Sequence, residues 1–568
     1  MDSFLQATVV RAADLALTPP NCGTANDDAD DCWSERDHEG RTPIASDDEA
    51  DNALEGSLEG FSLVAEESNT FGAATTYIHD ERRQSLLKRV MCCRDGDLLQ
   101  VLASHDWRPK GLDPCNLAFL WHASVSPDFF TQAETCFVTP PVEHSVPSLG
   151  DDVGSACQLL SSRTCFTMSG TPLWPAACAK WGSAHYLRAQ LHLDGGVHVL
   201  GNTAHAKDFS YFKESAAEFE RPACTSVRMT IADFLEHRGL AETRALSLIE
   251  PAGAAATSVC LYMQDTLLAR ADGGRMETPS GLGEEMLADI SGLNLPLLHT
   301  LQHAGGFGAW RMSQLFVGTR ATRGGRSTLH FDHNDNLFLQ VAGVKRFYLY
   351  PPTESGNMYA WPVFHALDRR AQVDIRRRDD PTHLAAFPRL AAARCVEVIL
   401  RPGMLLYLPA YWWHEVVTEE PQTVAEGGGD DDGLTVSINF WFEMDTARPL
   451  ALPLELHIRL ELSRQLESLV CHALDGEAAH VPVFLEALAF QWRAVQRHPQ
   501  DPHEPGAPAW ASLHAFRPPE VMGATWEALF EYVSFRAALL LSAAEVVPFL
   551  DDLCDPARFA CVANALDA

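Results

Sequence analysis

The chain of 568 residues carries a formal net charge of −33, and 46% of its residues are hydrophobic. This length and apolar content allow two or three domains with buried cores, and the negative charge makes nucleic acid an unlikely partner. The 15 cysteines form no Cys-x-x-Cys pair; without a secretory signal or a long apolar span we expect reduced thiols, no membrane attachment and a cytoplasmic or nuclear location.

The N-terminal part of the chain is strongly acidic. Residues 27–67 contain 15 aspartates and glutamates but only Arg36 and Arg41, and few bulky apolar side chains. Segments of this composition cannot bury enough apolar surface to fold. We therefore predict that residues 1–80 are largely disordered and act either as a solvating tail or as a partner-binding segment. Residues 81–160 contain helix-like pieces without a motif, and we expect a helical or mixed region there.

Short β-strands separated by turns with proline and glycine are predicted for residues 310–445. Residues 337–350 have the pattern of a hairpin, because two β-rich segments flank Ala342-Gly343. No long amphipathic helix interrupts the strands, which favours a sandwich or barrel over a parallel α/β sheet. We predict a double-stranded β-helix (a jelly roll) as the core of a domain over residues 161–445. Further strands are expected at residues 404–408, 412–416 and 434–442, the first two as one strand that Pro409 interrupts.

Beyond this domain the pattern becomes helical. Residues 452–474, 481–496 and 521–553 have helical periodicity, and a break rich in proline and histidine separates the last two. We predict a helical region over residues 446–568. The polar insertion at residues 419–433 is expected to be a mobile surface loop between two strands.

Three His-x-Asp triplets occur among the 23 histidines, and they start at His192, His330 and His333. A histidine and an aspartate two positions apart on a strand point to the same face of the sheet. His192 precedes a glycine turn and His333 lies in a polar run that indicates a loop, whereas His330 ends an apolar strand. His330 and Asp332 need one more ligand, and the distant His414 could supply it. The three side chains would then form the facial triad of non-haem Fe(II) oxygenases. The alternative is that these side chains have only a structural role.

Several segments in the same order resemble the JmjC/cupin-like Fe(II)- and 2-oxoglutarate-dependent oxygenases, most closely the asparaginyl hydroxylases of the factor-inhibiting-HIF type. The resemblance extends over about half of the chain, from residue 172 to residue 442. It implies hydroxylation of a protein or peptide side chain, coupled to the decarboxylation of 2-oxoglutarate to succinate, with Fe(II) and dioxygen. The segments that carry it are residues 171–175, 229–235, 261–267, 359–363, 368–374 and 411–414.

The resemblance also implies roles for single residues. His330, Asp332 and His414 match the iron ligands, and Lys345 matches the lysine that pairs with the distal carboxylate of 2-oxoglutarate. Lysine is also common at the edges of sheets, so Lys345 has that structural alternative. The remaining matches are to residues that hold the co-substrate or lie beside it and the iron: Tyr262, Ser327, Asn336, Asn439 and Trp441.

The substrate residues implied by the resemblance are Gln264, Arg369 and Arg370. The asparaginyl hydroxylases have glutamine at the position of Arg370, and arginine offers only donors, so it suits a carboxylate better than an amide. Alternatively, Arg370 turns outward to meet an acid of the 419–433 insertion. The sequence leaves open a lysyl hydroxylase, a histone lysine demethylase, a tRNA-modifying hydroxylase, a cupin-type metal isomerase and a non-catalytic scaffold. In the resembling family the C-terminal helices form a homodimer interface; here they could instead cover the barrel.

Overall fold

The structure, a computed structural model, describes most of residues 145–443 and parts of the C-terminal region. The described ranges are 145–170, 173–203, 208–210, 224–236, 259–271, 274–419, 433–443, 454–473, 480–497 and 543–560, with isolated residues between 478 and 541. The predicted acidic segment, residues 81–144 of the 81–160 region and most of the 419–433 insertion lie outside these ranges.

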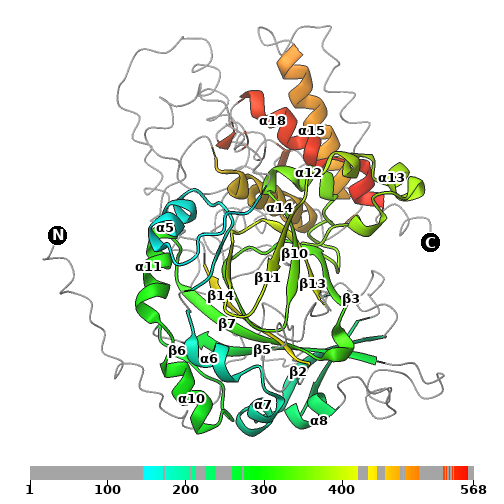
Figure 1. Cartoon of the computed structure of the whole chain (residues 1–568). Helices are drawn as coiled ribbons and strands as arrows, with labels where there is room; N and C mark the ends of the chain where they lie inside the picture. The colour runs from blue at the N-terminus through cyan, green and yellow to red at the C-terminus, as the bar shows by residue number, and fades with distance from the viewer. Residues whose placement is uncertain are drawn as a thin grey trace, which may run out of the picture.

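Two mainly antiparallel β-sheets stack face to face and form the centre of the molecule (Figure 1). This arrangement confirms the predicted jelly-roll class. The larger sheet has the order β1 (Phe166–Met168), β12 (Leu405–Leu408), β9 (Asp335–Ala342), β14 (Thr435–Phe442), β7 (Trp310–Gly318), β5 (Val259–Arg270), β2 (Val197–Thr203) and β4 (Thr225–Met229), with β6 (Met276–Glu277) beside β5. The smaller sheet has the order β11 (Val396–Leu400), β10 (Lys345–Tyr350), β13 (Trp413–Thr418), β8 (Arg326–His330) and β3 (Asp208–Phe209).

The predicted hairpin over residues 337–350 is wrong. β9 pairs with β12 and β14 in the larger sheet, whereas β10 pairs with β11 and β13 in the smaller one. Gly343 has a φ of +69° and lets the chain cross from one sheet to the other. Two β-rich segments around a glycine suit a hairpin and such an arch equally well, because both need a tight turn between apolar strands.

The same crossing separates β12 from β13, which we expected to be one interrupted strand. β12 lies beside β9, and β13 lies beside β10 and β8. The loop expected around His333 is short, because β9 already begins at Asp335, within the same polar run. The strand predicted at residues 434–442 is confirmed as β14, although all eight of its residues are buried because both faces of the larger sheet are covered.

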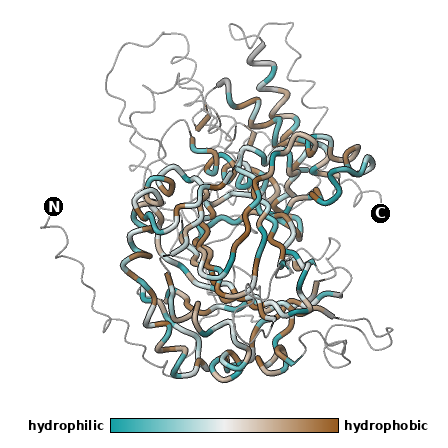
Figure 2. The backbone as a smooth tube through the Cα atoms, in the orientation of Figure 1, coloured by the Kyte–Doolittle hydropathy of each residue, from teal (hydrophilic) through white to brown (hydrophobic). Residues whose placement is uncertain are grey.

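Helices cover the outer face of the larger sheet. Their apolar side chains and those of the sheet form the largest hydrophobic core, and Figure 2 shows hydrophobic residues running along the central strands. Between the two sheets, one apolar cluster lies around Phe347 and Leu406, and a second lies around Phe209 and Tyr262. The covering helices are α5 (Val153–Ser161), α6 (Pro175–Lys180), α7 (Ala184–Gln190), α8 (Ile231–Glu236), α10 (Glu284–Ser291) and α11 (Leu295–Gly305).

Short helical turns follow β10 and precede β11. These are η6 (Pro352–Glu354), α12 (Ser355–Met358), η7 (Ile375–Arg377), α13 (Pro381–Ala386) and η8 (Pro388–Ala392), while η5 (Arg320–Thr322) links β7 to β8. The turns between β10 and β11 contribute apolar side chains that pack with Phe331 and Tyr411 in a third cluster, on the outer side of the smaller sheet.

The C-terminal helices have a hydrophobic core of their own. They are α14 (Leu456–Ala473), α15 (His480–Arg497) and α18 (Ala543–Leu553), followed by η11 (Pro556–Phe559). α14 lies between the barrel and the pair formed by α15 and α18 (Figure 1). Homodimerisation through this region stays a prediction. None of the helices in the described part of the chain has the length and hydropathy that a membrane span needs.

Candidate active site

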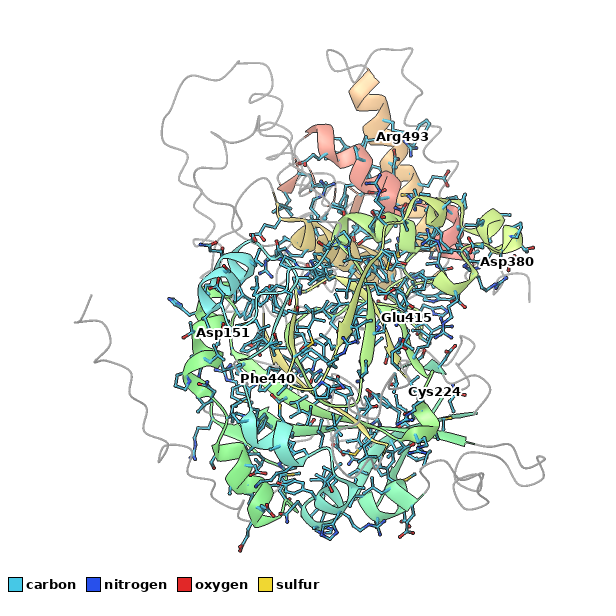
Figure 3. All side chains as sticks on the ribbon, in the orientation of Figure 1. Asp151, Cys224, Asp380, Glu415, Phe440 and Arg493 are labelled. Atoms are coloured by element: carbon cyan, nitrogen blue, oxygen red, sulfur yellow. The ribbon has the colours of Figure 1, made fainter. Side chains whose placement is uncertain are left out.

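Two imidazoles and one carboxylate converge between the sheets. His330 ends β8, Asp332 follows two residues later, and His414 lies opposite His330 on the neighbouring strand β13. One ligand atom from each of the three residues lies within 4.8 Å of the others, and all three side chains are buried. Glu415, labelled in Figure 3, points away from this site and pairs with Arg326 on the outer side of the sheet.

The hydrogen bonds around the triad leave its metal-binding atoms available. Nδ1 of His330 lies 2.7 Å from the Thr328 carbonyl and Nδ1 of His414 lies 3.0 Å from the Trp412 carbonyl, so each Nδ1 donates and each Nε2 is left as an acceptor. Burial holds the pKa of His330 well below its usual value. Burial alone would raise the pKa of Asp332, but the close approach of His414, whose Nε2 lies 3.4 Å from Asp332 Oδ2, and the positive charge of Arg369 lower it. A neutral imidazole beside an ionised carboxylate is the state that binds a divalent metal.

The other two His-x-Asp triplets do not form such a group. Asp335 accepts hydrogen bonds from Arg163, from the Tyr407 hydroxyl and from the Ala410 amide, so its oxygens serve the structure. The His333 ring stacks on Tyr411, with ring centroids 5.6 Å apart. In the described part of the chain, the group of three that includes His330 is the one whose geometry suits a metal ion.

A buried lysine lies in the same cavity. Lys345 begins β10, is 2% exposed, and donates to the Tyr262 hydroxyl at 3.0 Å. Its ammonium also lies 5.1 Å from the ring centre of Phe338 and 5.4 Å from that of Phe316. Within the described residues it contacts no carboxylate. Burial therefore lowers the pKa of Lys345 to about 7 and raises that of Tyr262.

An irregularity in β8 brings Ser327 into this cavity together with His330. Val416 pairs with Ser327 and His414 pairs with His330. Between these two pairs β8 contains one residue more than β13. Such a bulge turns side chains three positions apart toward the same face. Ser327 and His330 both line the cavity.

The larger sheet supplies the opposite wall. Asn336 on β9 pairs with Trp441 on β14, and Asn439 lies two residues before Trp441, so strand alternation turns all three toward the cavity. Phe440, labelled in Figure 3, points to the other side and joins the helix-covered core. Gln314 connects the two strands of this wall, since its backbone amide donates to Asn439 Oδ1 at 3.0 Å and its side-chain oxygen accepts from Trp441 Nε1 at 3.3 Å.

The family model that describes a cupin-like domain matches residues 166–448. This part of the chain is a cupin-like domain. An HSPB1-associated protein 1 homolog from Danio rerio is 33% identical over 137 residues, which are 24% of this chain and 26% of that protein. Jumonji C domain-containing protein 5 from Drosophila melanogaster is 32% identical over 117 residues, 21% of this chain and 25% of that protein. Lysine-specific demethylase JMJ31 from Arabidopsis thaliana is 29% identical over 120 residues, 21% of this chain and 19% of that protein. The chain thus spans about a quarter or less of these relatives.

Two of the three expected substrate residues line the cavity of the cupin-like domain. Arg370 is 6% exposed and donates to the carbonyl and the hydroxyl of Thr328 at 3.2 and 2.8 Å, so the outward orientation considered for it is wrong. Gln264 also lines the cavity, and its buried Nε2 has no hydrogen-bond partner among the described residues. Arg369 instead lies beside the triad, with Nη1 4.0 Å from Asp332 Oδ1.

Sequence reasoning missed three residues of the site. The Thr328 carbonyl accepts from both His330 and Arg370, and its hydroxyl bonds Ser210 at 2.8 Å. Its position two residues before His330 was a usable signal, because the two share a strand. Phe316 and Phe338 gave no such signal, since only the pairing of strands from different parts of the chain brings their rings to Lys345.

Proposed function

We propose that the cupin-like domain is an Fe(II)- and 2-oxoglutarate-dependent oxygenase that hydroxylates a protein side chain and converts 2-oxoglutarate to succinate. The observation that carries the proposal is Lys345. A buried ammonium without a carboxylate is costly, and it lies in the cavity that also contains the triad. A ligand with one carboxylate for Lys345 and a second metal-binding end fits both features.

The donor set fits the implied metal. His330 and His414 would bind Fe(II) through Nε2, and Asp332 through its carboxylate; when bound, iron supplies the activation of dioxygen. Lys345, Tyr262 and Ser327 would bind and orient the distal carboxylate of 2-oxoglutarate by charge-assisted hydrogen bonds. The aromatic rings around Lys345 exclude water from that end and strengthen those bonds.

The opposite wall completes this arrangement. Asn336, Asn439 and Trp441 would border the co-substrate and the iron from the larger sheet. Asn336 Oδ1 is buried and has no hydrogen-bond partner among the described residues. This supports a bound polar molecule at that wall, because buried polar groups are normally satisfied.

We propose an aspartyl or asparaginyl side chain as the target. The donors of Arg370 and Gln264 line the cavity and suit a side chain that carries oxygen acceptors. A lysine demethylase is the second candidate, because one relative bears that name. The net charge of −33 disfavours a tRNA substrate. A cupin-type isomerase or a scaffold would have no use for Lys345 in this cavity.

The deciding experiment measures succinate release from 2-oxoglutarate with Fe(II) and ascorbate. Peptide pools that differ in one position (Asp, Asn, Lys or methyl-lysine) are compared, and mass spectrometry detects the gain of one oxygen atom. We expect turnover to be stimulated by the Asp or Asn pool. Formaldehyde release from the methyl-lysine pool would select demethylation instead. Metal binding without any turnover of 2-oxoglutarate would reject the proposed reaction in favour of the isomerase.

A further inference from the structure

The face of α14 that points toward the barrel carries polar and charged residues that are almost completely buried. Glu461, Arg464, Gln465 and Glu467 are 3%, 7%, 2% and 1% exposed. Charged groups at such depth are destabilising unless they are paired. Their partners therefore show which segments of the chain this face of α14 positions. Two of those partners, Asp368 and Tyr411, belong to segments that contact the chain around Asp332.

Arg464 holds the segment that runs beside Asp332. Its guanidinium makes a two-pronged contact with the Asp368 carboxylate, and the two residues are 96 positions apart. The next residue, Arg369, has a φ of +65°; its backbone carbonyl accepts a hydrogen bond from the Phe331 amide at 3.1 Å, and its side chain extends toward Asp332. Fixing Asp368 thereby fixes the backbone against which Phe331 and Asp332 lie.

Glu461 holds the other side through Tyr411. The Tyr411 hydroxyl donates to Glu461, and the Tyr411 backbone amide donates to the Asp332 carbonyl at 2.8 Å. The same tyrosine ring stacks on Phe331 and on His333, at centroid distances of 5.1 and 5.6 Å. The residues before and after Asp332 are therefore both packed against a side chain that α14 anchors.

We propose that α14 is a positioning element of the metal site, and that Glu461 and Arg464 set the orientation of Asp332. This inference rests on the proposed function, because it assigns α14 a role in that same site. Asp332 is the triad member that lies outside a strand, so the sheet alone does not fix it. Outer residues that orient metal ligands commonly change metal affinity by about 10–100-fold.

The test measures Co(II) binding to the full chain, by the visible absorption of the bound metal and by titration calorimetry. Arg464→Met and Glu461→Leu should weaken Co(II) binding by about tenfold or more and alter the absorption spectrum. Glu461→Gln keeps an acceptor for Tyr411 and should restore most of the affinity. Arg459→Met is the matched control, because Arg459 lies on the same helix but pairs with Glu545 on α18. The apparent KM for 2-oxoglutarate should stay close to wild type in Arg459→Met.

The outcomes separate this inference from the proposed function. A wild-type chain that binds no Co(II) would reject the metal site itself. A wild-type chain that binds Co(II), together with unchanged affinity and spectrum in Arg464→Met and Glu461→Leu, would overturn the role of α14. Thermal unfolding followed by circular dichroism checks that each variant folds. If Arg464→Met does not, Tyr411→Phe decides, because it removes only the hydroxyl that contacts Glu461: unchanged Co(II) binding in that variant overturns the inference, and weakened binding supports it.

Discussion

Lys345 combines burial with a charge that no described carboxylate balances. Its ammonium is enclosed by aromatic rings and by the Tyr262 hydroxyl, and burial lowers its pKa to about 7. Such a residue destabilises the ligand-free protein and gains its partner only when an anion enters. A group that lowers stability in exchange for binding is typical of functional sites.

The first prediction is that Lys345→Met stabilises the protein without its ligands. The folded-state pKa lies below the unfolded value of 10.5, so the folded protein releases this proton first as the pH rises, and its stability increases between about pH 7 and pH 10.5. The advantage of the variant should be about 1 kcal/mol or more at pH 6 and should shrink toward pH 10. Chemical unfolding at several pH values measures it. An equal difference at every pH would contradict a buried charge at this site.

The same variant should lose affinity for the co-substrate. Without the ammonium, the apparent KM for 2-oxoglutarate should rise at least about tenfold, equivalent to about 1.4 kcal/mol of charge-assisted bonding. Lys180→Met is the control, because Lys180 pairs with Glu285 and Asp289 on the helical layer. An unchanged KM in Lys345→Met would point to a purely structural lysine and reopen the isomerase alternative.

The second prediction concerns the triad. His414→Ala should abolish turnover of 2-oxoglutarate and weaken Co(II) binding by at least about tenfold, because two remaining ligands hold a metal poorly. His192→Ala serves as the control, since His192 is an exposed histidine that also precedes an aspartate by two positions. Full activity of His414→Ala at micromolar iron would remove this residue from the ligand set.

The third prediction concerns substrate choice. Arg370 offers donors only, so aspartyl peptides should be hydroxylated at least as well as matched asparaginyl peptides. Arg370→Gln restores an acceptor and should shift the preference toward asparagine. Mass spectrometry of the two peptides with both enzymes gives the ratio. Identical ratios for wild type and variant would place the side chain of Arg370 outside substrate recognition.

Single residues of the site differ in how far the sequence reveals them. His330 and Asp332 could be predicted because their spacing and strand context are local, and Thr328 could have been. The aromatic surroundings of Lys345 could not, because Phe316 and Phe338 reach it only through the pairing of β7 and β9 with β14. The strands lie far apart in the sequence, so no local pattern of residues reveals how they pair.

At the scale of elements, the connection between β9 and β10 decides the shape of the cavity. The strands flanking Gly343 enter different sheets, and their inward faces bear Asn336 and Lys345 on opposite walls. The sequence revealed the two strands and the turn between them but not their partners, because apolar strands of this kind pair according to the whole sandwich. The prediction of a hairpin failed for that reason.

The fourth prediction compares two glycines with a positive φ. A Cβ on Gly343 would lie 2.5 Å from Thr435 Oγ1 and 2.9 Å from Thr435 Cα, whereas one on Gly403 meets no described atom within 4 Å. Gly403→Ala should therefore cost only the backbone strain, about 1 kcal/mol, and Gly343→Ala about 2–4 kcal/mol. Unfolding by urea measures both. Equal losses would show that the arch tolerates a side chain.

At the scale of the whole molecule, the candidate metal site lies between two sheets that must both be folded. The fifth prediction is that Co(II) stabilises the chain, by about 2.7 kcal/mol at a free concentration of 100 times its Kd. Adding a chelator should reverse the increase in Tm. His414→Ala should show no increase, and a similar increase in that variant would indicate metal binding elsewhere.

The alternation of successive strands between the sheets also governs the order of events during synthesis. β8 with His330 leaves the ribosome well before β13 with His414, and β14 with Asn439 follows later still. Contacts between such distant segments form slowly, because the long loop between them must first be closed. A growing chain therefore has neither the triad nor the second wall around Lys345 until the sandwich closes. On the proposed function, iron and co-substrate would enter a barrel that is already folded.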